Sequence, residues 1–262
     1  MNNAFYKIAS QISDPRRVTS GTENMAPLLY SLVRMTRPQR ILELGIGYST
    51  LFSLQAMADN VKDIGREKEA LLAKSSFLAG RKTLDLRSAK ARPIIDKWRA
   101  MPGMASCVDP RYYSQDYTPR LISLDILKHQ HPYIKRLRKG IKMLGHDALF
   151  QFVSYDKFSA ELLPSGFVPI DFVFHDNHEK GFFEKLWPFI NPNGGILVVH
   201  GVPCSNEFWE ETDAIRATEK NLELFILEEP HKYEQNGCAV FRKTNVICHH
   251  INAYRLRRCA TH

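Results

Sequence analysis

The sequence lacks any apolar run of about 18 residues, which is the length that a transmembrane helix requires. Its first residues, MNNAFYKIASQISDPRR, also lack the basic start and the long apolar centre of a secretion signal. The five cysteines are scattered and have no C-x-x-C spacing, which argues against a disulfide framework and against a cysteine zinc site. These absences predict a cytoplasmic protein with reduced thiols and no membrane contact.

Acidic residues are scarce in two stretches of a chain whose net charge is +8. Residues 128–142 hold six Lys or Arg residues, and the segment after Glu234 holds five and no acid. Such patches can bind nucleic acid. However, no recognisable nucleic-acid-binding module accompanies them, and a solvated helix face and a basic tail would explain them too. The composition therefore argues against nucleic acid as the main partner.

Continuous apolar runs predict five strands that are buried on both faces, at residues 40–45, 120–126, 149–155, 170–176 and 195–201. Helical patterns separate these runs, so we expect parallel strands with helices on both faces of the sheet. Two further runs, 222–229 and 237–244, are joined by a segment too short for a helical crossover and should form an antiparallel hairpin. The predicted fold is an α/β, Rossmann-like sheet of seven mostly parallel strands.

Residues 61–118 interrupt the alternation of strands and helices. Because most connections of this type have about 2–6 residues, such a long stretch is typically functional or independently folded. Its charged, helical pattern predicts a helical insertion that could serve as a lid. We expect four parts: a helical N-terminal segment (1–38) whose last helix stops before Pro38, a core (39–60 and 119–245), the insertion (61–118) and a basic tail (246–262).

The segment RILELGIGYST, residues 40–50, ends the first predicted strand with Glu43, Gly45 and Gly47. In an open parallel sheet, ligands bind beyond the carboxyl ends of the strands. Glycine lets the backbone approach a ligand without a Cβ in the way. The third glycine of the dinucleotide pattern G-x-G-x-x-G would fall at Thr50, which weakens a pyrophosphate interpretation. A glutamate beside the glycines would repel phosphates and suits a cationic ligand.

This E-x-G-x-G pattern, with acids at the ends of later strands, resembles the class I S-adenosylmethionine (SAM)-dependent methyltransferases over about residues 20–245. In that family, the first acid and the glycine backbone hold the amino-acid end of SAM. The acid that ends the second strand binds the ribose, and an acid after the third strand holds the adenine amino group. The resemblance therefore implies a SAM site formed by Glu43, Gly45, Gly47, Asp125 and Asp156, with Asp176 ending the fourth strand.

The GYST segment, together with SGTENMAPLLYSLVRMTRPQRILELG, resembles the small-molecule O-methyltransferase branch of this family. The resemblance makes Ser49 a candidate SAM contact. Helix N-capping would explain Ser49 and Thr50 equally well.

The resemblance departs from the catechol-methylating branch at its metal site. That branch holds Mg²⁺ with the acid of the fourth strand and an Asp-Asn pair after the fifth strand. Here His200 and Gly201 stand where that pair would be, so we expect no metal. His175, Asp176, His178 and His200 could in principle form a nitrogen and oxygen site, which we treat as a minor alternative.

Candidate catalytic residues follow the fourth and fifth strands. Methyl transfer needs alignment of donor and acceptor, exclusion of water and, in some cases, removal of a proton from the acceptor. His178 and His200 are candidate bases because histidine titrates near neutral pH, and Asp176 with Asn177 could orient the acceptor or the SAM amino group. Roles as polar rim residues or caps would also explain both histidines. Asp171 opens its strand, away from the ligand end, so we expect a structural role there.

The insertion ends in DPRYYSQDYTPR, whose Tyr112, Tyr113 and Tyr117 precede the strand that carries Asp125. These rings could fold back over SAM, since a tyrosine face attracts a sulfonium by about 0.5–2 kcal/mol. Ordinary packing of the insertion against the body is the alternative.

Two reactions of SAM are open at this point. The first is methyl transfer to a small, natural-product-like acceptor. The second is cyclisation, in which the amino nitrogen of SAM attacks its own γ-carbon and expels methylthioadenosine. Some methyltransferase-like proteins of nonribosomal peptide pathways make azetidine-2-carboxylate in this way. RNA or protein methylation and a non-catalytic role are lesser alternatives, and the amphipathic N-terminal segment is compatible with a homodimer.

Overall fold

The computed structural model describes residues 3–12, 22–79, 88–101, 112–176, 181–234 and 236–244. The chain divides into two compact units, Met1–Met57 with Pro119–His262, and Ala58–Thr118. The boundaries expected for the insertion, 61–118, lie close to those of the second unit. The predicted tail, 246–262, lies outside the described residues.

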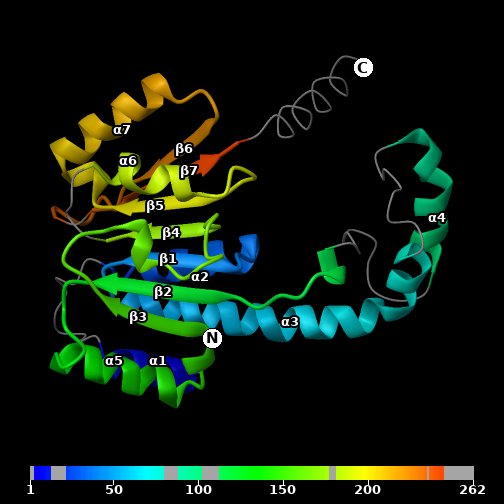
Figure 1. Cartoon of the computed structure of the whole chain (residues 1–262), viewed down its shortest axis with the longest axis horizontal. Helices are drawn as coiled ribbons and strands as arrows, with labels where there is room; N and C mark the ends of the chain where they lie inside the picture. The colour runs from blue at the N-terminus through cyan, green and yellow to red at the C-terminus, as the bar shows by residue number, and fades with distance from the viewer. Residues whose placement is uncertain are drawn as a thin grey trace. The chain divides into compact units, whose positions relative to one another are not determined.

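The described part of the first unit forms a seven-stranded sheet in the order β3-β2-β1-β4-β5-β7-β6 (Figure 1). Strands β1 to β5 pair in parallel, whereas β7 runs antiparallel to both β5 and β6. The strands are β1 Arg40–Leu44, β2 Arg120–Asp125, β3 Phe150–Ser154, β4 Phe172–His175, β5 Ile196–His200, β6 Leu222–Leu227 and β7 Cys238–Lys243. The predicted fold and its final hairpin are confirmed.

Each face of this sheet is covered by helices, and strand residues alternate between the two apolar clusters that result. Ile41 and Phe172 pack in the cluster with α1, α2, α3 and α5, whereas Leu42 and Val173 pack in the cluster with α6 and α7. This period of two is the signature of a strand buried on both sides. The helices are α1 Asn3–Ile12, α2 Met25–Thr36, α3 Tyr48–Ala79, α5 Pro132–Met143, α6 Phe182–Leu186 and α7 Asn206–Thr218.

Local sequence signals set the ends of several helices. Helix α2 ends at Thr36, where Arg37 adopts a left-handed conformation (φ 49°) and Pro38 follows, as expected. Helix α5 starts with Pro132 in its first turn, and the Nδ1 atom of His131 accepts a hydrogen bond from the Tyr133 amide at 3.3 Å. The start of α5 is thereby fixed a few residues after the end of β2.

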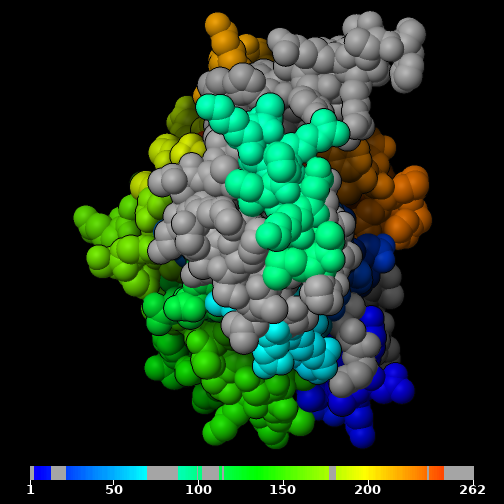
Figure 2. Space-filling view, turned by 90° about the vertical axis from the view of Figure 1, so that its right-hand side faces the viewer, coloured from blue at the N-terminus to red at the C-terminus, as the bar shows by residue number. Residues whose placement is uncertain are grey.

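The second unit contains the continuation of α3 and helix α4, Arg92–Ala100. Helix α3 has 32 residues and continues without a break past Asn60, where we expected the core to end. Helix α4, turquoise in Figure 2, lies at the surface of this unit, and its Trp98 is buried while Asp96 and Lys97 are exposed. In the described part of the chain, no helix is both long and apolar enough to cross a membrane.

Candidate functional site

The alternation of side chains gathers polar residues at the carboxyl end of the parallel strands, on the sheet face that α1, α2, α3 and α5 cover. Glu43 of β1 lies in register with Ser123 of β2 and Phe174 of β4, and Phe174 packs on that face. Residues two positions further along a strand project to the same side. The polar set on this face therefore comprises Glu43, Ser123, Asp125, Asp176 and His200.

Gly45 follows β1 and allows its turn to approach the end of β4. Its φ of +95° is strained for any residue with a side chain, and a Cβ there would lie 2.6 Å from the backbone oxygen of Asp176. The Gly45 amide donates to the carbonyl of Leu124 at 2.9 Å, and the Asp176 amide donates to the carbonyl of Leu44 at 2.8 Å. The glycine is thus required for the ends of β1, β2 and β4 to meet.

Asp125 ties the glycine turn to the end of β2. Its Oδ2 atom accepts a hydrogen bond from the Ile46 amide at 2.9 Å, and its Oδ1 atom accepts one from the Leu127 amide at 2.8 Å. A carboxylate offers about four acceptor positions, so these two bonds orient the group and leave capacity for a ligand.

Glu43 is only 1% exposed and lies beneath the turn. Its carboxylate accepts hydrogen bonds from Ser49 at 2.8 Å, from Thr50 at 2.7 Å and from Ser123. Burial raises the pKa of Glu43 to about 7, although the three hydroxyl donors act in the opposite direction. The sequence motif therefore contains a buried carboxylate that accepts three hydrogen bonds from within the protein.

Ser49 and Thr50 were candidates for ligand contact or for helix capping, and both are buried. Each hydroxyl donates to Glu43, and the Thr50 Oγ1 atom also accepts a hydrogen bond from the Gly47 amide at 2.9 Å. The last bond resembles the reverse half of a capping box at the start of α3. Ser49 and Thr50 thus bind the Glu43 carboxylate, and Thr50 also binds the backbone of the glycine turn.

Asp176 and His200 form a close pair at the ends of the adjacent strands β4 and β5. Their Oδ1 and Nδ1 atoms are 2.7 Å apart, and the side chains are 27% and 5% exposed, respectively. An ionised carboxylate can only accept a hydrogen bond, so Nδ1 donates to it. Asp176 is the accessible member of the pair and His200 the buried one.

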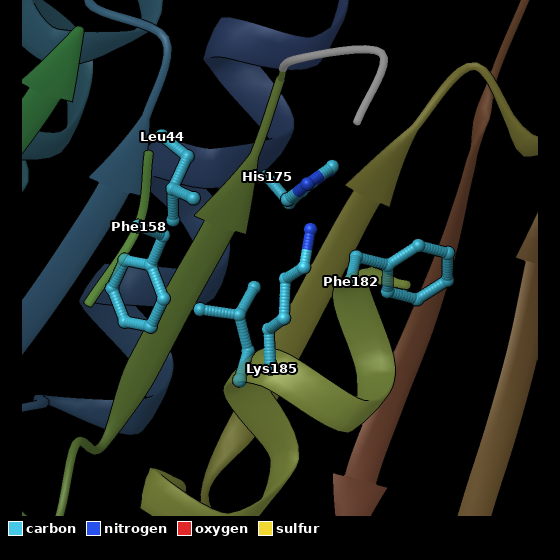
Figure 3. A pocket seen from close by; sticks show the side chains of 6 residues that line it. Leu44, Phe158, His175, Phe182 and Lys185 are labelled. Atoms are coloured by element: carbon cyan, nitrogen blue, oxygen red, sulfur yellow. The ribbon is translucent and has the colours of Figure 1, made fainter. Parts of the chain in front are cut away.

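His175 lies on the opposite face of the sheet from Asp176. Its ring packs against Phe182 and Phe208, with centroids 5.4 and 6.3 Å away. Figure 3 shows the Lys185 side chain rising from α6 toward His175 in a hollow that Leu44 and Phe158 also line. The empty space in this hollow is about 180 Å³, open solvent included.

Two predicted residues next to Asp176, Asn177 and His178, lie outside the described residues. Within the residues that the structure describes, no group of three or more His, Cys, Asp or Glu side chains is placed to hold a metal ion. His175 is separated by the sheet from Asp176 and His200, with which it could have shared a metal.

Asp156, the predicted adenine contact, follows β3 and has a side chain that is 90% exposed. It forms an ion pair with Lys128, which follows β2, at 3.2 Å. The residue is therefore at the expected end of the sheet, and its contact with adenine stays a prediction.

The three predicted lid tyrosines lie in the second unit, where two of them hydrogen-bond to the extension of α3. Tyr113 donates to Glu67 at 2.7 Å, and the Tyr117 hydroxyl accepts a hydrogen bond from Asn60 at 3.4 Å. Tyr112 is 43% exposed and packs edge-on against Tyr113 at 5.2 Å. Their placement over SAM stays a prediction.

Tyr133 is a candidate that the sequence interpretation missed. It lies in the first turn of α5, and a Cβ built on Gly47 would lie 3.6 Å from its hydroxyl oxygen. The residue belongs to the basic stretch 128–142, which we interpreted as a solvated helix face. The signal that could have revealed it is Pro132, since proline favours the first turn of a helix and the helix follows Asp125 closely.

Comparison with solved structures gives matches along most of the chain at low sequence identity. The O-methyltransferase TomG from Streptomyces achromogenes, involved in tomaymycin synthesis and solved with SAM, has a TM-score of 0.57 and 15% identity, covering 94% of this chain and 91% of that chain. An O-methyltransferase from Bacillus cereus, solved with SAH, has a TM-score of 0.54 and 12% identity, covering 94% and 92%. A methyltransferase from Geobacter sulfurreducens has a TM-score of 0.52 and 13% identity, covering 94% and 91%.

No protein-family model matches the chain, and no curated protein matches it in sequence. The structural matches show that the chain has the fold of the class I SAM-dependent methyltransferases.

Proposed function

We propose that this protein is a SAM-dependent methyltransferase that acts on a small-molecule acceptor and needs no metal ion. The observation that carries the proposal is the position of the Gly45 turn, between Asp125 and the Asp176–His200 pair. Parallel α/β sheets bind ligands at this carboxyl end. The matched structures that were solved with SAM or SAH support the same ligand.

The charge of the crevice fits a cationic nucleoside. Asp125 and Asp176 lie at the ends of strands on either side of β1, so their charges add at the glycine turn. Asp125 retains acceptor positions that suit the two ribose hydroxyls. Glu43 is buried and accepts three hydrogen bonds from protein hydroxyls, which favours a role in supporting the turn over direct contact with the ligand. SAM, when bound, supplies a methyl group on a cationic sulfur. The acceptor attacks the methyl carbon in line with the carbon–sulfur bond, and the sulfur leaves as the neutral thioether of SAH.

The Asp176–His200 pair is the proposed proton acceptor. Since Asp176 is the more exposed, an acceptor hydroxyl would contact its carboxylate, while the buried imidazole of His200 fixes the orientation of that carboxylate. The neighbouring Asn177 and His178 are further candidates for orienting the acceptor, and replacing each with alanine would test them. We propose a metal-free reaction because Asp176 and His200 stand where the catechol-methylating branch has metal ligands, and here they hydrogen-bond to each other instead.

The remaining sequence predictions are part of the same proposal. Tyr112, Tyr113 and Tyr117 would belong to a lid formed by the second unit, and Asp156 would contact the adenine. A cytoplasmic location, a homodimer and a natural-product-like acceptor also stay predictions.

The test is a product analysis of the purified protein with SAM under matched conditions. One arm contains SAM alone, one adds a panel of phenols, catechols and hydroxylated heterocycles, one adds RNA, and one repeats the panel with EDTA. We expect SAH to form only with a small-molecule acceptor and EDTA to have no effect. The Asp125→Ala variant serves as the control for contaminating activity.

Other products would contradict this proposal in specific ways. Formation of methylthioadenosine above the non-enzymatic background, with no acceptor present, would show that the reaction is cyclisation of SAM to azetidine-2-carboxylate and not methyl transfer. SAH formation that requires RNA would assign a function to the basic stretch 128–142. Loss of activity in EDTA would overturn the metal-free mechanism, and failure to bind SAM or SAH would overturn the whole proposal.

A further inference from the structure

The glycine turn of this site has no amide left for a ligand. The amide of Gly45 donates to the Leu124 carbonyl, that of Ile46 to Asp125, and that of Gly47 to Thr50. All three distances are 2.9 Å. A donor for an anionic group beside residues 45–47 therefore has to come from a side chain or from the first-turn amides of α3.

The hydroxyl groups around the turn are committed as well. Ser49, Thr50 and Ser123 all donate to the buried carboxylate of Glu43. A hydroxyl has one proton to donate, so none of these three can also donate to a ligand in this arrangement.

Tyr133 supplies a hydroxyl at the same place. Its oxygen would lie 3.6 Å from a Cβ on Gly47, so the phenol stands directly beside the turn. Its ring packs against the apolar cluster beneath α5, and the hydroxyl makes no hydrogen bond with any residue that the structure describes. The ring is thus anchored, while its polar end is available.

The surroundings keep this phenol in its protonated form. Burial raises the pKa of Tyr133 to about 12, and the carboxylates of Glu43, Asp125 and Asp176 contribute in the same direction. Arg136 lowers this pKa, but its effect is smaller than those of burial, Glu43 and Asp125. The hydroxyl is consequently a neutral donor throughout the physiological pH range.

SAM carries one anionic group, its α-carboxylate, and the carboxylates of the crevice repel it. We propose that Tyr133 binds this carboxylate, with its hydroxyl donating a hydrogen bond beside Gly47. The inference rests on the proposed function, because it assigns a donor to the SAM molecule that the site would hold. The acids of the crevice then attract the cationic part of SAM, and Tyr133 accommodates its anionic part.

The test is a thermodynamic cycle with two ligands that differ only in this carboxylate. Isothermal titration calorimetry compares SAH with decarboxylated SAH for the wild-type protein and for Tyr133→Phe. The substitution keeps the ring and removes the hydroxyl. Tyr233→Phe is the matched control, since Tyr233 is 93% exposed, and thermal unfolding checks that each variant is folded.

We expect Tyr133→Phe to weaken the binding of SAH by about 10-fold or more, as for a lost hydrogen bond to a charged group. The affinity for decarboxylated SAH should change by less than about 2-fold. Equal losses for the two ligands would overturn the inference, because the hydroxyl would then contact another part of the nucleoside or act on the fold. Unchanged SAH affinity would overturn it too, and would leave the first-turn amides of α3 as the donors for the carboxylate.

The outcomes also separate this inference from the proposed function. If the wild-type protein binds neither ligand, the SAM-dependent function itself fails. If it binds SAH normally and Tyr133→Phe behaves like the control variant, only the role of Tyr133 fails.

Discussion

The two ends of the same parallel strands carry aspartates that behave differently. At the amino end, Asp171 accepts hydrogen bonds from the amides of Gln39 and Arg40, both at 3.0 Å, and from the Asn191 side chain at 2.8 Å. These bonds hold together the starts of β1 and β4 and the segment before β5. At the carboxyl end, Asp125 holds the glycine turn, and Asp176 pairs with His200.

This difference shows that the partners of a carboxylate, more than its residue type, distinguish a structural role from a candidate site. Asp171 binds only groups that fix the start of the sheet. Asp125 and Asp176 border a turn whose backbone geometry demands glycine, at the end where this fold binds ligands. Substitutions at the two ends should therefore separate ligand binding and turnover from stability.

The largest effect is expected from Asp125→Ala. The substitution removes the acceptor for the Ile46 amide and the proposed ribose contacts together, so SAH affinity should fall by about 100-fold or more. Isothermal titration calorimetry measures this. Retained affinity would mean that the end of β2 does not contact the nucleoside.

Asp176→Asn should reduce turnover by about 100-fold, because loss of a general base typically costs about 10²–10⁴ in rate. Binding of SAH should change little, since the residue is proposed to act on the acceptor. His200→Gln, which changes only the supporting partner, should have a smaller effect of about 10-fold. Steady-state kinetics with a hydroxylated acceptor checks both, and a larger loss in His200→Gln would reverse the proposed roles.

Glu43 should make stability depend on pH. Its folded-state pKa of about 7 lies above its ordinary value of 4.5, so the folded protein retains a proton that the unfolded chain releases between these values. Stability should therefore fall as pH rises through this window, by up to about 3 kcal/mol. Urea denaturation at pH 5 and pH 8 should show a smaller decrease in Glu43→Gln than in the wild type.

The matched control for this effect is Glu223→Gln, whose carboxylate pairs with Arg242 on the surface and is 54% exposed. It should leave the pH dependence as it is in the wild type. The same pH dependence in Glu43→Gln and in the wild type would show that Glu43 does not titrate in this range.

The smallest effect is expected from Asp171→Asn. The isosteric amide keeps one acceptor oxygen and loses charge-assisted bonds to two backbone amides, so the free energy of unfolding should fall by about 1–2 kcal/mol. Denaturant unfolding measures this loss, while SAH affinity should match the wild type. A clear loss of SAH binding by the folded variant would mean that the two ends of the sheet are coupled.

The sequence predicts the strands because each is a continuous apolar run, and a parallel sheet buried on both faces requires such runs. It also predicts the glycine turn, since the positive φ of Gly45 and its contact with Asp176 allow no side chain. These features depend on local residue type. They could be inferred without knowing which distant residues meet.

The partners of each polar group could not be inferred in this way. The bonds from Ser123 to Glu43 and the position of Tyr133 beside Gly47 join residues that are about 80 positions apart in the chain. They depend on strand register and on where α5 begins. The sequence predicts helix on both sides of Asn60, but not that one helix, α3, runs through this position for 32 residues.

The most direct test of this account is a crystal structure of the protein with SAH. We predict that the ribose hydroxyls contact Asp125 and that the sulfur lies near the Gly45 turn, on the side of Asp176 and His200. Ligand density on the opposite face of the sheet, at His175 and Lys185, or a ligand that contacts neither Asp125 nor the glycine turn, would contradict it.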